Sequence, residues 1–442
     1  MSWAEVFKIN NNMDISLNEL LLNILAGGYR QYIYDSQRYT VPFSGTYTIR
    51  AYCGSYGSYG KVVKNFTKGE ILTITITGNT AITITSDLQG TSVFHINLAK
   101  DSYVNANSVD GIKAIAIGGA IWQTAGGDAY VRCNNGIAAG GGGSGGINYG
   151  NATTKIGYKG GNAYAYGTNV YALGGGGGGG GWNSSGNGAG GAGGNAFING
   201  VELTDYCGVT TLKSGKGYNG DSGHDGSTWT YGGYGGNGGC GGGSGSHRCD
   251  VNTTTTPWRV GGAGYFSYGG YRVGGSARGG NIGSMHGIRN VASKVGEYGH
   301  PKGYFVGGVG LDGSSDAGAP HIGGTGGFLG GCGGNAGLRS GNGGKGGYSP
   351  YGFGGQGGKG FEASDYYYYG GAGGDGKIFG GNSGVGPAGE LSAGGNGYYP
   401  GIGSPNGVAL TNNIIMGTAP RSGMTPTTSI VIIEYGNSIE DF

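Results

Sequence analysis

Apolar and polar residues alternate along the first part of the chain, which is the pattern of strands with one buried face. The alternation runs through residues 47–52 and 72–76, and it resumes at 81–85 after Gly78-Asn79. A Gly-Asn pair between two alternating runs indicates a tight hairpin. The same reasoning predicts strands at three further places: 92–98, 112–117 and a hairpin over 196–203.

One apolar strand is expected far from the others in the sequence. Residues 429–435 read Ser-Ile-Val-Ile-Ile-Glu-Tyr, and so continuous an apolar run is typical of a central strand of a sheet. A sheet that contains this strand together with the early ones is split, and the region between them is an insertion. Closing contacts so remote in sequence predict slow folding.

A short helix is expected before the strands, over residues 14–27. Ser16 and Glu19 have the spacing of a capping box, and Gly27-Gly28 ends the helix. Its apolar stripe is formed by Leu17, Leu20, Leu21, Ile24 and Leu25. Because so short a helix is marginal alone, it either caps the first domain or serves attachment and oligomerisation.

The region from about residue 140 to 397 repeats Gly-Gly-x, as in Gly193-Gly194-Asn195. Fixing each residue costs about 1–2 kcal/mol, and glycine has no side chain to bury in return. A polyproline II helix has about three residues per turn and directs its amides outward. Such helices, packed side by side, can exchange backbone hydrogen bonds. The repeat therefore predicts polyglycine II helices, and irregular glycine loops over a β-core are the alternative. With 10 prolines against 115 glycines, collagen does not fit.

Composition and charge exclude several classes of function. The net charge of +2 and the lack of a Lys/Arg block give no case for a nucleic-acid partner. The first residues lack the layout of a signal peptide. No apolar run approaches the roughly 18 residues of a membrane span. The sequence thus predicts a soluble protein without membrane insertion, which the general secretory route does not export.

The motifs of the sequence predict no catalytic site, no metal site and no cofactor. Gly-x-Gly-x-x-Gly is uninformative at this glycine content, and Gly215-Lys216 is not followed by the Ser or Thr of a P-loop. The turn Asp221–Asp225 is read as a polar turn rather than a cation site. The six cysteines form no Cys-x-x-Cys pair and are expected to be free thiols: Cys53, Cys133, Cys207, Cys240, Cys249 and Cys332.

Two stretches near the start resemble the opening of a tumour-necrosis-factor-like jelly roll. These are Tyr-Thr-Val-Pro-Phe-Ser-Gly-Thr-Tyr-Thr-Ile at 39–49 and Lys-Gly-Glu-Ile-Leu-Thr-Ile at 68–74. Similar openings precede the glycine-rich region of the anaplastic lymphoma kinase family, where polyglycine II helices are inserted between strands. The resemblance implies a jelly roll and, by analogy, a trimer. This chain departs from that family in having no signal peptide, transmembrane segment or kinase.

The glycine-rich region also resembles bacteriophage tail-fibre adhesins, whose tip domains can be polyglycine II sandwiches with variable loops at the helix ends. The opening Ser-Trp-Ala-Glu-Val-Phe-Lys-Ile-Asn at 2–10 is similar to the starts of tail-associated proteins in phages and prophages of Gram-positive bacteria. The resemblance implies a virion protein of the phage tail, made in the host cytoplasm and released by lysis.

The expected fold is mostly β, with a jelly-roll-like β-sandwich, a large inserted bundle of polyglycine II helices and a short N-terminal α-helix. Residues 1–28 form the attachment or oligomerisation helix. Residues 29–130, completed by 406–442, form the sandwich. Residues 131–405 form the glycine-rich domain with its receptor-facing loops.

Aromatic residues between the glycine runs are the candidate receptor contacts. Tyr, Ser, Gly and Asn together are the composition of antibody-type binding loops. Some of these rings are expected to cover the glycine lattice, and the others to contact the receptor. The candidates are Trp182, Trp229, Tyr231, Tyr234, Trp258, Tyr366, Tyr367, Tyr368, Tyr369, Tyr398 and Tyr399.

The sequence therefore predicts a non-enzymatic tail-fibre or tail-tip receptor-binding protein that recognises a bacterial surface glycan or protein. The N-terminal region would bind other tail or fibre proteins, and the chain would form a homo-oligomer. The alternative is a structural virion or filament subunit whose glycine-rich domain packs against itself. An enzyme such as a polysaccharide depolymerase needs paired carboxylates, which the sequence does not locate.

Overall fold

The computed structural model describes part of the chain, and every regular element in that part is a strand. The expected mostly-β class is thereby confirmed, whereas the helix predicted over 14–27 lies outside the described residues. The described residues are 29–86, 94–106, 113–119, 124–143, 156–183, 186–208, 211–225, 230–231, 235–238, 362–363, 366–367, 372, 383, 391–396, 403–406, 408 and 429–435.

A seven-stranded sheet contains both the early strands and the last one. The final strand lies between two early strands and pairs antiparallel with each, for example Ile433 with Gln31 and with Ile49. The prediction of a central final strand in a split sheet is therefore confirmed. The order of strands is β1 (Tyr29–Ile33), β22 (Ile430–Tyr435), β3 (Gly45–Cys53), β4 (Ser58–Phe66), β9 (Lys113–Ile117), β11 (Asn135–Ala139) and β13 (Asn169–Leu173).

A nine-stranded sheet contains both predicted hairpins. In β5–β6 the chain turns at Gly78 (φ 52°), and in β16–β17 it turns at Asn199 and Gly200 (φ 49° and 84°). Positive φ at these positions is what tight hairpin turns require. The order is β17 (Val201–Glu202), β16 (Ala196–Ile198), β12 (Ala163–Tyr166), β10 (Ala129–Arg132), β8 (Ser102–Ala106), β7 (Phe94–Leu98), β6 (Ala81–Ser86), β5 (Ile71–Thr77) and β2 (Gln37–Thr40).

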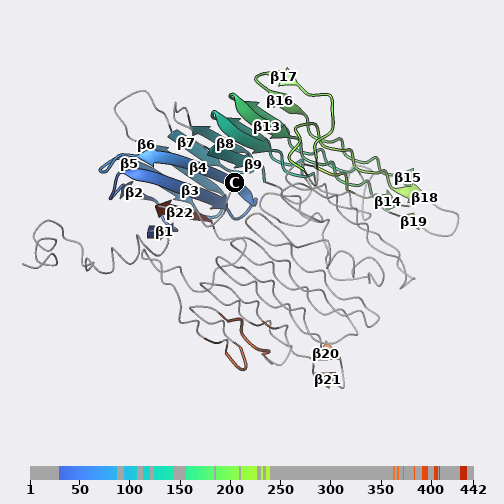
Figure 1. Ribbon diagram of the computed structural model, residues 1–442. Coiled ribbons are helices and arrows are strands. Elements are labelled where there is room, and N and C mark those ends of the chain that lie inside the picture. Colours follow the sequence, from blue (N-terminus) through green and yellow to red (C-terminus); the bar gives the residue numbers. More distant parts are fainter. Residues whose placement is uncertain are drawn as a thin grey trace, which may run out of the picture.

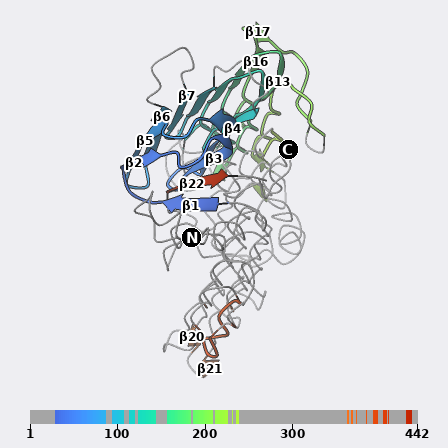
Figure 2. The ribbon, with the colours of Figure 1, turned by 60° about the vertical axis from the view of Figure 1, so that its left-hand side comes forward.

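The two sheets pack against each other around one hydrophobic cluster (Figures 1 and 2). Ile49 and Val62 enter it from the seven-stranded sheet, and Ile84, Ile96 and Val104 from the nine-stranded sheet; all five side chains are fully buried. The opposite face of the seven-stranded sheet is buried as well, in a second cluster. Burial on both faces explains why β22 reads as a continuous apolar run rather than as an alternation.

Strands of both sheets continue past residue 130, where the sequence predicted the glycine-rich domain with a single hairpin over 196–203. These later strands pair in parallel, β8–β10–β12–β16 in one sheet and β9–β11–β13 in the other. A jelly roll is antiparallel, so this part of the fold differs from the expected pattern. Parallel neighbours need a long crossover, and the glycine-rich excursions between the strands provide it.

Three of the parallel strands, β10, β12 and β16, belong to a repeat with the motif Gly-Gly-Asx-Ala-aromatic, at 126–130, 160–164 and 193–197. The Asx side chain of one copy accepts a hydrogen bond from the backbone of the next copy. Asn162 N lies 2.7 Å from Asp128 Oδ1, and Asn195 N lies 2.9 Å from Asn162 Oδ1. Each copy therefore sets the register of the one that follows.

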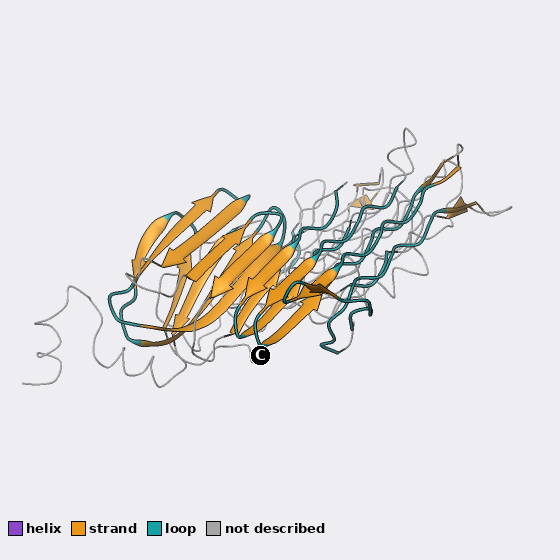
Figure 3. Cartoon of the chain, turned by 90° about the horizontal axis from the view of Figure 1, so that it is seen from above, coloured by secondary structure: helices purple, strands orange, loops and turns teal. Residues whose placement is uncertain are grey.

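The glycine segments continue the strands away from the sheets, as Figure 3 shows from above. Residues 174–181 follow β13, residues 188–195 lead into β16, and residues 215–223 lie beside both. Their backbones are hydrogen-bonded at every third residue. The bonds are Gly174, Gly177 and Gly180 N to the carbonyls of Gly215, Tyr218 and Asp221; Gly188, Gly191 and Gly194 N to those of Gly181, Gly178 and Gly175; and Gly217, Gly220 and Gly223 N to those of Gly194, Gly191 and Gly188.

Segment 174–181 lies at the centre of this arrangement. It is hydrogen-bonded to five other described segments: 140–143, 156–162, 188–195, 215–223 and 235–238. The approach is so close that a Cβ on Gly175 would overlap the backbone carbonyl of Gly141, and one on Gly177 that of Gly191. Only glycine fits at such positions, which explains the composition of the run.

Candidate functional site

Two short hairpins end the central glycine segments. The strands β14 (Trp182–Asn183) and β15 (Gly186–Asn187) join segment 174–181 to segment 188–195. The strands β18 (His224–Asp225) and β19 (Thr230–Tyr231) follow segment 215–223. β15 lies beside β18, and both hairpins lie at the end of the glycine segments that is far from the two sheets (Figure 1). We call these two hairpins the tip.

The tip contains two of the residues that the sequence selected, one in each hairpin. Trp182 pairs with Asn187 across the first hairpin, and Tyr231 pairs with His224 across the second. A third hairpin, β20 (Glu362–Ala363) with β21 (Tyr366–Tyr367), carries two more candidates and lies apart from the tip in Figure 1. The other candidates lie outside the described residues: Trp229, Tyr234, Trp258, Tyr368, Tyr369, Tyr398 and Tyr399.

A row of aromatic rings on the outer face of the nine-stranded sheet was not predicted. Tyr103 stacks on Tyr130 with ring centroids 4.7 Å apart, and Tyr164 stacks on Phe197 at 4.9 Å. Tyr166 packs against Tyr130 at 5.2 Å. Burial raises the pKa of Tyr130 and of Tyr164. The signal for this row was available in the sequence, because the last position of the repeat motif is aromatic in every copy.

The stacked row has a structural explanation. Aromatic pairs on neighbouring strands contribute roughly 0.2–1 kcal/mol each to the pairing of a sheet. Their ring faces are covered by one another, so few faces are left on which a ligand could stack. We therefore assign this row to the register of the parallel strands rather than to ligand binding.

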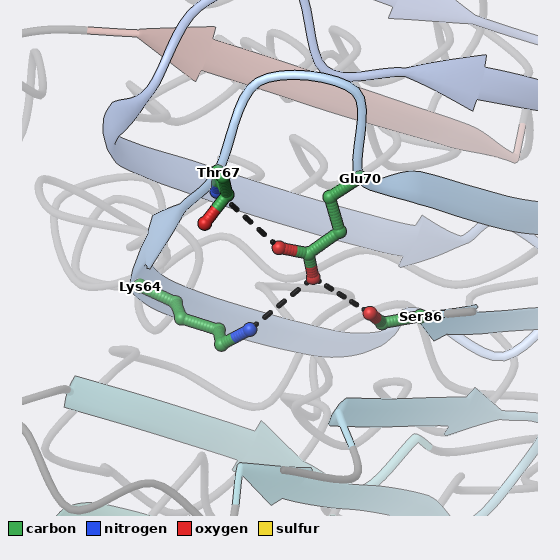
Figure 4. A network of polar contacts seen from close by, with 4 residues as sticks. All are labelled: Lys64, Thr67, Glu70 and Ser86. Carbon is green, nitrogen blue, oxygen red and sulfur yellow. Dashed lines mark hydrogen bonds and ion pairs between the residues drawn. The ribbon is translucent and has the colours of Figure 1, made fainter. Parts of the chain in front are cut away.

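A buried ion pair fixes the loop that crosses from β4 to β5 (Figure 4). Lys64 Nζ lies 3.3 Å from Glu70 Oε1, which also accepts a hydrogen bond of 2.6 Å from Ser86 Oγ. The other carboxylate oxygen accepts one from the Thr67 amide at 3.4 Å. Because both oxygens of Glu70 are occupied by the protein itself, this network has a structural role.

The described cysteines are buried thiols that form no disulfide: Cys53, Cys133 and Cys207. Burial raises the pKa of Cys53 to about 11 and that of Cys207 to about 12. A thiol that stays protonated is a poor nucleophile, so these cysteines are packing residues. Within the described ranges, no three His, Cys, Asp or Glu side chains are grouped so that they could hold a metal ion. The same ranges contain no helix that is long and apolar enough to span a membrane.

Comparison with known proteins does not supply a function. The chain matches no protein-family model, no curated protein and no solved structure. Its function therefore has to be inferred from its own structure. The feature that we use is the tip, a pair of adjacent hairpins at the end of glycine segments that are hydrogen-bonded to one another. Such an arrangement fixes the backbone of the two hairpins, and this lowers the cost of ordering that backbone when a partner binds.

Proposed function

We propose that this chain is a non-enzymatic receptor-binding protein of a bacteriophage tail fibre or tail tip, which recognises a component of the bacterial surface. The observation that carries the proposal is the regular bonding of the glycine segments, every third residue, up to the paired hairpins of the tip. The resemblance of residues 2–10 to phage tail proteins supports the assignment to a virion.

The proposal treats the two sheets as a jelly-roll-like β-sandwich and the glycine segments as polyglycine II helices. The three-residue interval of the hydrogen bonds supports these helices. The backbone supports them too, because every described glycine with a positive φ lies outside the segments 174–181, 188–195 and 215–223. At a rise of about 3.1 Å per residue, the eight glycines of 174–181 would hold the tip about 25 Å beyond β13.

Trp182 and Tyr231 are the first receptor contacts in this proposal, and the remaining selected aromatic residues are further candidates. The receptor is a surface glycan or a surface protein. Residues 1–28 bind other tail or fibre proteins, and the chain is a homo-oligomer, with a trimer as the state implied by analogy. Several copies on one particle would multiply weak individual contacts.

A second candidate function is a structural virion or filament subunit. Ala189 and Ala192 are exposed on segment 188–195, whose intervening glycines are mostly buried. Exposed side chains as small as those of Ala let a second copy approach closely. In that case the glycine-rich domain packs against itself and binds no receptor.

Binding of the purified chain to a panel of bacterial strains tests the proposal. The wild type is expected to bind some strains, and Trp182→Ala combined with Tyr231→Ala should weaken binding at least tenfold, about 1.4 kcal/mol. Tyr171→Ala is the matched control, because Tyr171 is 39% exposed on β13, outside the tip. Circular dichroism verifies that the variants are folded. Absence of binding to every strain would favour the structural subunit, and full binding by the double variant would reject the tip as the contact.

A further inference from the structure

Two tyrosines at the base of the glycine segments form an exposed stacked pair. The rings of Tyr206 and Tyr218 are 4.3 Å apart between centroids and 20° from parallel. Both stay exposed, at 41% and 38%. Lys216 places its Nζ 4.7 Å from the centroid of the Tyr206 ring. Exposed rings that are stacked on each other, with a cation beside them, differ from the half-buried row on the nine-stranded sheet.

The backbone holds this pair in place. Lys216 N donates to Asp205 O at 2.8 Å, and Cys207 N donates to Lys216 O at 3.0 Å, so the chain on both sides of Tyr206 is fixed. Tyr218 is fixed through its own backbone, because its amide donates to Asn237 O and its carbonyl accepts from Gly177 N. A ligand that met these rings would therefore pay little for ordering them.

The pair lies away from the tip. Gly215, three residues before Tyr218, forms a parallel bridge with Leu173 at the end of β13. The tip hairpins begin only at the opposite end of the same glycine segments. Binding here would thus be separate from the receptor contact proposed for Trp182 and Tyr231.

The charges around the pair indicate the class of ligand. An aromatic face is negative, so it attracts cations and also the C–H face of a sugar ring. Lys216 already lies over Tyr206 and disfavours a cationic ligand. Lys213 adds a second ammonium: it lies 3.5 Å from Asp205, but the two side chains are 59% and 74% exposed. Such an exposed pair is weak, and Lys213 can exchange to another anion.

We propose that Tyr206 and Tyr218, with Lys213 and Lys216, form a binding site for a pyranose ring that carries an anionic substituent. The sugar stacks its C–H face on the exposed ring of Tyr218. A carboxylate or phosphate on the sugar pairs with the two ammonium groups. The site is a glycan contact on the flank of the protein, independent of whatever the tip binds.

Saturation-transfer NMR on the full chain tests the site, with glucuronic acid, glucose 6-phosphate and glucose as probes. The two anionic sugars are expected to bind more tightly than glucose, and the stronger of them identifies the substituent. Tyr218→Ala should reduce affinity at least tenfold, whereas Tyr218→Phe keeps the ring face and should retain binding. Lys216→Met should reduce the affinity for an anionic sugar to that for glucose.

Tyr171→Ala is again the matched control, because Tyr171 is exposed to the same degree and belongs to neither pair. Absence of transfer to all three sugars overturns the proposal, as does equal binding by wild type and Tyr218→Ala. Self-association that Tyr218→Ala abolishes would assign the pair to a contact between copies and would also overturn it. None of these outcomes depends on the cell-binding result for Trp182 and Tyr231, so the two proposals can fail separately.

Discussion

The two sheets are stabilised mainly by packed side chains, whereas the glycine segments are stabilised mainly by hydrogen bonds of the backbone. Between the sheets, apolar side chains such as Ile84 and Ile96 are fully buried in one cluster. The glycines of the glycine segments have no side chain to bury, and backbone amides of one segment donate to carbonyls of its neighbours at every third residue. One such hydrogen bond stabilises the fold by only about 1 kcal/mol net. The bonds can therefore stabilise the glycine segments only because they recur along each segment.

Because the two regions are stabilised differently, a change in side-chain size should affect their stability in opposite ways. In the sheets, removing atoms leaves a cavity among packed side chains. In the glycine segments, adding a single carbon drives one backbone into another. Substitutions in opposite directions should therefore be harmful in the two regions, and this is the most direct way to test the comparison.

The largest effect is expected in the sheets. Ile84→Ala deletes methyl groups at the centre of the cluster and should cost about 2–5 kcal/mol of the free energy of unfolding. Denaturant unfolding followed by circular dichroism measures it. Thr83→Val is the control, because Thr83 is the neighbouring, half-buried residue of β6, and its change should stay within about 0.5 kcal/mol. Equal stability of the two variants would contradict the side-chain explanation for the sheets.

A smaller loss is expected in the glycine segments. Gly175→Ala places a Cβ against the carbonyl of Gly141 and should cost about 1–3 kcal/mol, the usual range for overpacking. Ala192→Ser, at an exposed position of the neighbouring segment, is the control and should be nearly neutral.

Hydrogen exchange shows which segments of the Gly175→Ala variant are destabilised. In Gly175→Ala, amides of 174–181 and 188–195 should exchange faster, while those of β6 and β7 keep their protection. An unchanged pattern in the glycine segments would show that their backbone bonds do not hold the region together.

Local patterns in the sequence were sufficient for several antiparallel elements of the fold. The β5–β6 hairpin at Gly78, the hairpin at Asn199-Gly200 and the apolar strand β22 each follow from neighbouring residues, and the structure contains all three. The parallel pairing of strands was missed because it joins residues that are far apart in the sequence. Ala129 pairs with Ala163, and Ala163 with Ala196. Only a comparison of the three copies of Gly-Gly-Asx-Ala-aromatic reveals that register.

The candidate sites likewise include one that local sequence predicts and one that it does not. Trp182 closes a run of eight glycines, so a turn there could be predicted, and the structure has the β14–β15 hairpin at that point. The stacking of Tyr206 on Tyr218 could not, because it requires the alignment of residues 205–207 with 215–217. No local pattern encodes that alignment.

An effect that appears only at alkaline pH concerns the boundary of the two regions, at Cys207. Its thiol is 2% exposed, packs in the second cluster of the seven-stranded sheet and donates to Gly174 O at 3.8 Å, where the central glycine run begins. Burial raises the pKa of this thiol from 9.0 to about 12. Between these values the unfolded chain loses the proton while the folded protein keeps it, so stability falls as the pH rises.

Comparison with Cys207→Ala isolates this contribution. Below pH 9 the difference in stability between the two proteins should be constant, since the thiol is protonated in both states. From pH 9 toward 12 the wild type should lose about 1.4 kcal/mol per pH unit more than the variant, because all other titrating groups are common to both. Unfolding midpoints measured at pH 8, 9, 10 and 11 provide the test. Parallel curves would mean that the thiol is hydrated in the folded protein, and that the junction between side-chain packing and backbone bonding is open to water.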